Sequence, residues 1–145
     1  MTVCGHIFSE ELTLVDKRLP DYRSKQKILY VDNTPADELV RFGDMFLADG
    51  IISDALDFYA KAKNTSGIQR IKQLALASGD VMLFMRAVKT AGEELQPADW
   101  EAVAQKAIDL RKYLFAKYAV EKANNEILLN NLKKAMDKEE QVKQE

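Results

Sequence analysis

The sequence between Leu39 and Ala62 decides the fold: it reads Leu39-x-x-Phe42-Gly43-x-x-Phe46-x-x-x-Gly50-x-x-x-x-Ala55-x-x-x-Tyr59-x-x-Ala62. Its apolar and small residues recur every three or four positions, which is the spacing of one face of an α-helix. The pattern is interrupted at Gly50, and glycine readily takes the left-handed geometry that ends a helix. We therefore predict two antiparallel helices that approach closely at small residues, with aromatic rings filling the remaining space.

The order of these residues resembles a tetratricopeptide repeat, a two-helix unit of about 34 residues that stacks on neighbours of its own kind. In this family a small residue at the Gly43 position allows close helix approach, and Gly50 makes the turn. Ala55 and Ala62 give the second helix a thin face, and Tyr59 fills the gap beside it. The resemblance implies an all-α fold of stacked antiparallel helix pairs, a tetratricopeptide-like α-solenoid. It also implies protein–protein binding rather than enzymatic activity.

Start and stop signals divide the rest of the chain into helices. Thr34 is the expected N-cap of the first helix, with proline at the first helical position and acidic residues in the first turn. The same signal returns at 96–99. The glycines at Gly50 and Gly79 mark equivalent turns twenty-nine residues apart, so the unit is about thirty residues long. The expected helices are residues 35–48, 52–63, 68–77 and 81–90.

The later units depart from the pattern of the first. In the second unit Phe84 stands where Ala55 stands in the first, which predicts a wider helix separation or a shifted register. The third unit is expected to contribute only its first helix, around Trp100 and Ala104. No glycine or proline follows Pro97, so this region is predicted to be one long C-terminal helix, or two helices bent near 124–125.

These patterns divide the chain into an N-terminal arm (1–33), a helical repeat domain (34–123) and a C-terminal helical extension (124–145). A short helix is expected to begin at Ser9, and residues 25–31 are expected to pack on the following helices in an extended or helical form. The arm also has a basic cluster that nearby acids balance, so we expect it to be solvated. Its members are Arg18, Arg23, Lys25 and Lys27.

Composition excludes several classes of function. The 145 residues have 21 basic and 23 acidic side chains, and this balance gives no reason to expect nucleic acid or an anionic membrane as a partner. Cys4 and His6 are the only cysteine and histidine, too few for a disulfide or a structural zinc site, and we expect both in a mobile terminus. No catalytic constellation, phosphate loop, cofactor motif, membrane span or signal peptide is visible. A non-enzymatic cytoplasmic protein is therefore predicted, with no metal or cofactor.

The resemblance places a peptide-binding groove on the inner face of the first helices. Chaperone-binding members grip a peptide carboxylate with a lysine and an asparagine where Val40 and Asp44 stand here, so a mixed groove for a basic or neutral segment is expected instead. The alternative is that these side chains merely face solvent. The candidate partner-binding residues are Asp37, Val40, Asp44, Leu47, Gln69, Gln73 and Leu76.

An apolar stripe near the C-terminus offers a second function. Leu128, Leu132, Ala135 and Val142 recur at helical spacing among lysines and glutamates. Such a stripe packs on its own domain, which is the default, or on a second copy in a homodimer. The alternative function is therefore a structural or regulatory subunit that self-associates through Leu128, Leu132 and Ala135.

Overall fold

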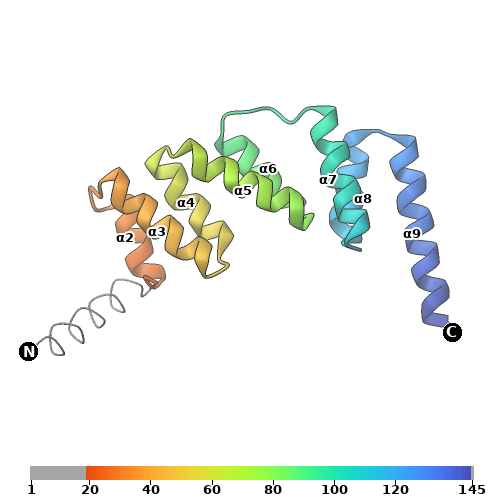
Figure 1. Cartoon of the computed structure of the whole chain (residues 1–145), viewed down its shortest axis with the longest axis horizontal. Helices are drawn as coiled ribbons and strands as arrows, with labels where there is room; N and C mark the ends of the chain where they lie inside the picture. Colours follow the sequence, from red (N-terminus) through yellow and green to blue (C-terminus); the bar gives the residue numbers. More distant parts are fainter. Residues whose placement is uncertain (1–18, 145) are drawn as a thin grey trace, which may run out of the picture. The chain divides into compact units, whose positions relative to one another are not determined.

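The computed structural model of the chain describes residues 19–144, and Figure 1 shows this part to be all-α. It has a long C-terminal helix and no strand within the described range, which confirms the fold class predicted from the sequence. None of these helices is both long and apolar enough to cross a membrane. The eight helices of the described part are α2 (Tyr22–Tyr30), α3 (Ala36–Ala48), α4 (Ile52–Ala62), α5 (Thr65–Ser78), α6 (Val81–Thr90), α7 (Pro97–Asp109), α8 (Tyr113–Ala123) and α9 (Glu126–Gln144).

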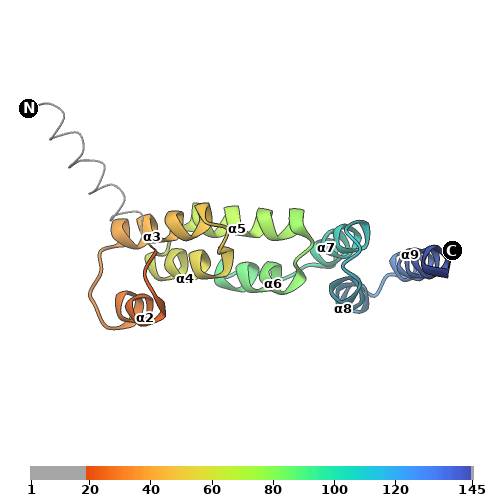
Figure 2. The same ribbon diagram turned by 90° about the horizontal axis from the view of Figure 1, so that it is seen from below.

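The chain divides after Asn64 into two compact units. The first unit contains α2 and the antiparallel pair α3–α4, which lie side by side in Figure 2. Its core is aromatic: the ring of Phe58 lies 5.6 Å from that of Phe42 and 5.3 Å from that of Phe46. Gly43 is buried against the ring of Tyr59, so the small residue allows the close approach that the sequence predicted.

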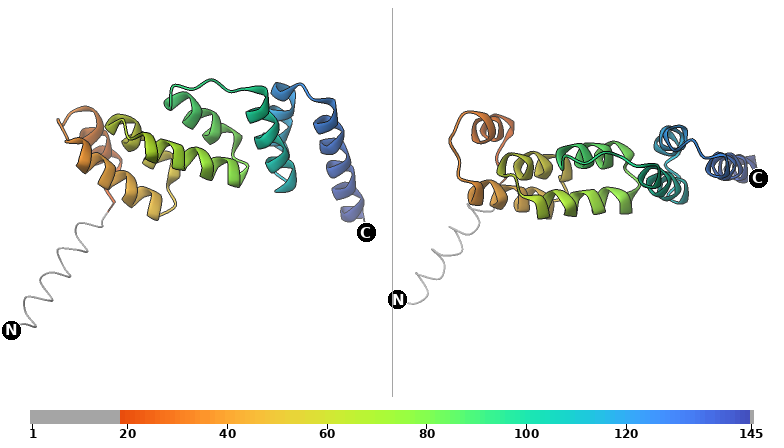
Figure 3. Two further views of the ribbon diagram at one scale, coloured as in Figure 1. Left: turned by 45° about the horizontal axis from the view of Figure 1, so that its top comes forward. Right: turned by 90° about the horizontal axis from the view of Figure 1, so that it is seen from above.

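The second unit contains the pairs α5–α6 and α7–α8 and the long helix α9. Figure 3 shows α9 beyond the α7–α8 pair, and its backbone contacts both helices of that pair. One continuous core of buried residues joins α5 to α9, and it includes Val81, Phe84 and Val103. The three pairs thus repeat one arrangement in which a first and a second helix run antiparallel.

Left-handed residues punctuate these pairs at regular positions. Turns within pairs contain Gly50, Gly79 and Arg111, and turns between pairs contain Lys63, Gly92 and Asn124. The left-handed residue of each between-pair turn comes thirteen positions after the left-handed residue of the within-pair turn before it. Each within-pair turn closes with a hydrogen bond from the next N–H to the carbonyl five residues earlier, at 2.9, 3.0 and 2.9 Å. The second helix of each pair therefore lies in a segment of the same length.

The third pair is complete, which corrects the prediction that it has only its first helix. The bend near 124–125 was predicted correctly, but the chain also turns at Arg111 between α7 and α8. Ala104 precedes Arg111 by seven residues, as Gly43 precedes Gly50, and Ala116 follows it by five, as Ala55 follows Gly50. Both alanines are fully buried, so α7 and α8 pack closely through small residues as α3 and α4 do.

The middle pair departs from the close packing of the other two at the position of Phe84. Phe84 is buried between α5 and its neighbours at the position that alanine occupies in the other two pairs. As a result, the backbones of α5 and α6 run close over less of their length than those of α3 and α4.

Two predicted helix starts differ from those in the structure. Thr34 does not cap α3, because its hydroxyl donates to the carbonyl of Ile28 at 3.1 Å, and the extended Pro35 takes the capping position. The residues 64–67, which we expected to form a loop, include the first turn of α5, because left-handed Lys63 has already reversed the chain. By contrast, Pro97 is the first residue of α7 as predicted, and Asp99 accepts a hydrogen bond from the N–H of Gln96 at 2.9 Å.

The described part of the arm contains one helix. α2 covers residues 22–30, and Leu29 and Lys25 are buried. The expectation that residues 25–31 pack in a helical form is thus confirmed for Lys25 and Leu29, whereas Tyr30 and Val31 are exposed. The predictions for Cys4, His6, Ser9 and Arg18 lie outside the described residues.

Candidate functional site

The second unit has a hollow between the first helices of its two pairs. It has a volume of about 370 Å³ and is lined by Gln73, Leu76 and Ala77 of α5 and by Ala102 and Lys106 of α7. Gln73 and Leu76 are two of the residues that the sequence predicted to bind a partner. The hollow therefore contains two of the seven predicted residues, but its other wall is α7, from which no binding residue was predicted.

Close contacts at one end of α5 hold the two walls of this hollow together. A Cβ atom added to Gly79 would lie 3.1 Å from the Cα atom of Ala107, so a larger residue would push the α5–α6 turn away from α7. The ammonium group of Lys112 also donates to the carbonyl of Ser78 at the last residue of α5. The C-terminal end of α5 is thus held against the α7–α8 pair by close packing and by a charged hydrogen bond.

The hollow combines an apolar surface with two polar groups. Leu76 is half-buried, and the alanines leave space beside it because they have no side chain beyond Cβ. Gln73 and Lys106 are exposed, and neither side chain makes a hydrogen bond or ion pair with any of the residues that the structure describes. An amide and an ammonium group are thus available to a ligand that enters the hollow.

Gln69, a third predicted binding residue of α5, is engaged elsewhere. Its amide donates to Glu93 Oε1 at 2.6 Å, and the ammonium of Lys72 lies 2.8 Å from Glu93 Oε2. The hydrogen bonds from Lys72 and Gln69 lower the pKa of the Glu93 carboxyl. These contacts tie the loop after α6 to α5, and Gln69 does not line the hollow.

The remaining predicted residues lie on α3 in the first unit, where a separate hollow of about 510 Å³ is found. Of these residues only Asp44 lines it, and Asp44 also accepts a hydrogen bond from the hydroxyl of Tyr59. Asp37 is exposed, Val40 and Leu47 are half-buried, and none of the three lines the hollow. The other residues that line this hollow are Leu19, Arg41, Met45, Ala48 and Asp49. The seven predicted residues are thus divided between two units.

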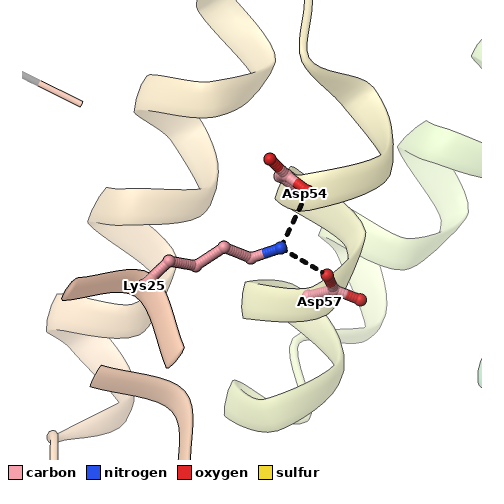
Figure 4. A network of polar contacts seen from close by, with 3 residues as sticks. All are labelled: Lys25, Asp54 and Asp57. Atoms are coloured by element: carbon pink, nitrogen blue, oxygen red, sulfur yellow. Dashed lines mark hydrogen bonds and ion pairs between the residues drawn. The ribbon is translucent and has the colours of Figure 1, made fainter. Parts of the chain in front are cut away.

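A buried ion-pair network in the first unit was not predicted (Figure 4). Lys25 of α2 is only 8% exposed, and its ammonium lies 2.7 Å from Asp54 Oδ1 and 2.8 Å from Asp57 Oδ2 on α4. Burial by itself would lower the pKa of Lys25, but hydrogen bonds to the two aspartates raise it above its ordinary value. The expectation that Lys25 belongs to a solvated basic cluster is therefore wrong. The two aspartates share one face of α4, and their spacing is the signal that could have indicated a basic partner.

The first part of the C-terminal stripe packs on its own domain, whereas Val142 is 65% exposed. Leu128 and Leu132 are buried in the core of the second unit, and Ala135 is partly buried against it. A second copy therefore cannot reach these two leucines while α9 remains in place. Leu129 and Met136 are exposed on another side of α9 and are available for association.

No group of three or more His, Cys, Asp or Glu residues in the described part of the chain is arranged to hold a metal ion. Comparison of the chain with protein-family models, with curated proteins and with solved structures found no match.

Proposed function

We propose that this chain is a tetratricopeptide-like protein-interaction module that binds a segment of a partner protein on the surface of its first helices. The observation that supports this most directly is the hollow between α5 and α7. It brings Gln73 and Leu76, chosen from the sequence, together with Ala102 and Lys106 of the next pair. A half-buried apolar surface next to available polar groups is typical of sites that recognise peptides.

The chemistry of the hollow favours binding over catalysis. Its lining has one amide and one amine, and it contains neither a nucleophile with an adjacent base nor a pair of acids. Such groups can orient a peptide by hydrogen bonds and charge.

Site-specific photocrosslinking tests this proposal. A benzophenone amino acid at Ala77 would lie in the hollow, and the same amino acid at Lys117, exposed on α8, provides the matched control. We expect a crosslinked protein from position 77 in cells of the source organism, absent from position 117 and abolished by Leu76→Glu. Equal crosslinking from both positions, or none from either, would contradict the proposal.

A second candidate function is a structural subunit that self-associates through α9. It is favoured by the exposed apolar side chains of Leu129 and Met136, which lie beside the buried stripe. Sedimentation equilibrium of the wild-type chain and of Leu129→Glu/Met136→Glu tests it. A dimer that the double variant converts to a monomer would support self-association, whereas a monomeric wild-type chain would exclude it at the concentrations measured.

A further inference from the structure

We infer that the hollow between α5 and α7 selects an acidic segment, in which an aspartate or glutamate lies next to an aliphatic residue. This inference rests on the proposed function and specifies the partner. It differs from the basic or neutral segment expected from the sequence, because that expectation considered the acids of α3 and did not include any residue of α7.

The charge of the hollow comes from a single residue. Lys106 is the only charged group among the five lining residues, and no carboxylate lines the hollow. Two acids of α7 flank the lining residues: Asp109 accepts a hydrogen bond from Gln105 at 2.8 Å and lines a different hollow near α9, and Glu101 accepts one from Asn125 at 3.3 Å. A carboxylate of the partner would therefore meet an ammonium that no described side chain already neutralises.

The apolar part of the hollow determines what lies beside that carboxylate. Leu76 supplies the largest apolar surface, and Ala77 and Ala102 leave room for one aliphatic side chain rather than for the long apolar face of a helix. Gln73 has both a donor and an acceptor, so it can hydrogen-bond to the N–H and carbonyl of an extended peptide. Together these groups fit a short extended segment with one apolar and one acidic side chain.

The hollow in the first unit has the opposite charge, which makes the preference a property of this site rather than of first helices in general. Asp44 and Asp49 line it together with one guanidinium group, that of Arg41. An acidic segment would be repelled there by the excess of carboxylates. Therefore, we do not extend the inference to the first unit.

The test uses a library of random heptapeptides displayed on phage and selected against the full chain. Peptides that bind wild type but not Leu76→Glu define the hollow, and the best of them is synthesised with a fluorescent label for measurement of Kd. The charge-reversal variant is Lys106→Glu, and the matched control is Lys117→Glu, an equally exposed lysine on α8. Both lysines are exposed, so both variants should retain the circular dichroism and thermal stability of the wild-type chain.

We expect aspartate or glutamate next to an aliphatic residue to be enriched in the selected peptides. Lys106→Glu should raise the Kd by about three- to tenfold, since an exposed ion pair is replaced by repulsion of similar size, while Lys117→Glu leaves it unchanged. Peptides that depend on Leu76 but show no acidic enrichment, or that bind Lys106→Glu equally well, would overturn this inference and leave the proposed function intact. If no peptide depends on Leu76, both would be refuted.

Discussion

Replacing Gly43 with alanine should destabilise the first unit, although alanine is the better helix former. In an exposed helix this change would stabilise by about 1 kcal/mol. At this position, however, the added Cβ would lie 2.8 Å from Cε1, 3.0 Å from Cδ1 and 3.1 Å from Cζ of Tyr59. Contacts this short require the ring or the helix to move.

The ring has little freedom to move away. Tyr59 is 2% exposed, and its hydroxyl donates to Asp44 on the same helix as Gly43. Overpacking of a close-packed core costs about 1–3 kcal/mol, which exceeds the gain in helix propensity. We therefore expect Gly43→Ala to lower the free energy of unfolding by about 1–2 kcal/mol, and the larger Gly43→Leu to lower it further.

The third pair provides a compensating change. Ala104 and Val120 stand there at the positions of Gly43 and Tyr59, and both are buried. Tyr59→Val alone should cost about 2–4 kcal/mol because it leaves a cavity. In the Gly43→Ala background the same change should cost about 1–2 kcal/mol less, since it removes the ring that the new methyl group meets.

Urea denaturation of the four proteins of this double-mutant cycle, followed by far-ultraviolet circular dichroism, measures the coupling. A Gly43→Ala variant as stable as the wild type would refute the close approach of α3 and α4. Strictly additive effects of the two substitutions would refute the specific contact between position 43 and the Tyr59 ring.

Three further predictions follow from the backbone and from the buried lysine. Lys25→Met should lower the free energy of unfolding by about 1–2 kcal/mol near neutral pH. The folded-state pKa of Lys25 is raised above its ordinary value of 10.5, so the stabilising contribution of its charge is complete at any pH below 10.5. Chemical denaturation at increasing pH should show this contribution disappearing as the pH rises through the folded-state pKa. Arg111→Gly should raise the free energy of unfolding by about 0.5–1 kcal/mol, because Arg111 has a φ of 60°, which glycine adopts without strain. An unchanged or lower melting temperature of the variant would contradict this. Gly79→Ala should cost about 1–2 kcal/mol more than Gly92→Ala in urea denaturation, since both have positive φ but only Gly79 contacts the backbone of Ala107.

The helix pairs could be predicted where glycine and small residues mark them. Gly50 and Gly79 identify two turns, and the small residues Gly43 and Ala55 identify a closely packed pair because larger side chains would hold the two helices apart. The turn at Arg111 was missed because an arginine in the left-handed region has no sequence signature. Counting thirteen residues back from the Asn124 turn would have found it, but this interval becomes visible only when the other turns are known.

The candidate site could be predicted in part for a similar reason. Gln73 and Leu76 were found because their register relative to Gly79 is fixed within one helix. Lys106 was missed because it belongs to the next pair, whose alignment depends on the turn at Arg111. The ion pairs of Lys25 were missed because they join residues about thirty positions apart, and the packing of α2 on α4 determines them.

Packing and surface positions are subject to different constraints in these pairs, and this difference bears on function. In the two closely packed pairs, the residue seven positions before the within-pair turn is small because the second helix lies against it. The residue five positions before each turn differs among the three pairs, which have Met45, Leu74 and Lys106 there. Packing within the pair therefore does not restrict the charge of this residue. The packing of α7 on α8 therefore does not explain why this position is a lysine. If Lys106→Gln weakens binding of the selected peptide while the free energy of unfolding is unchanged, the charge at this position serves the partner rather than the fold.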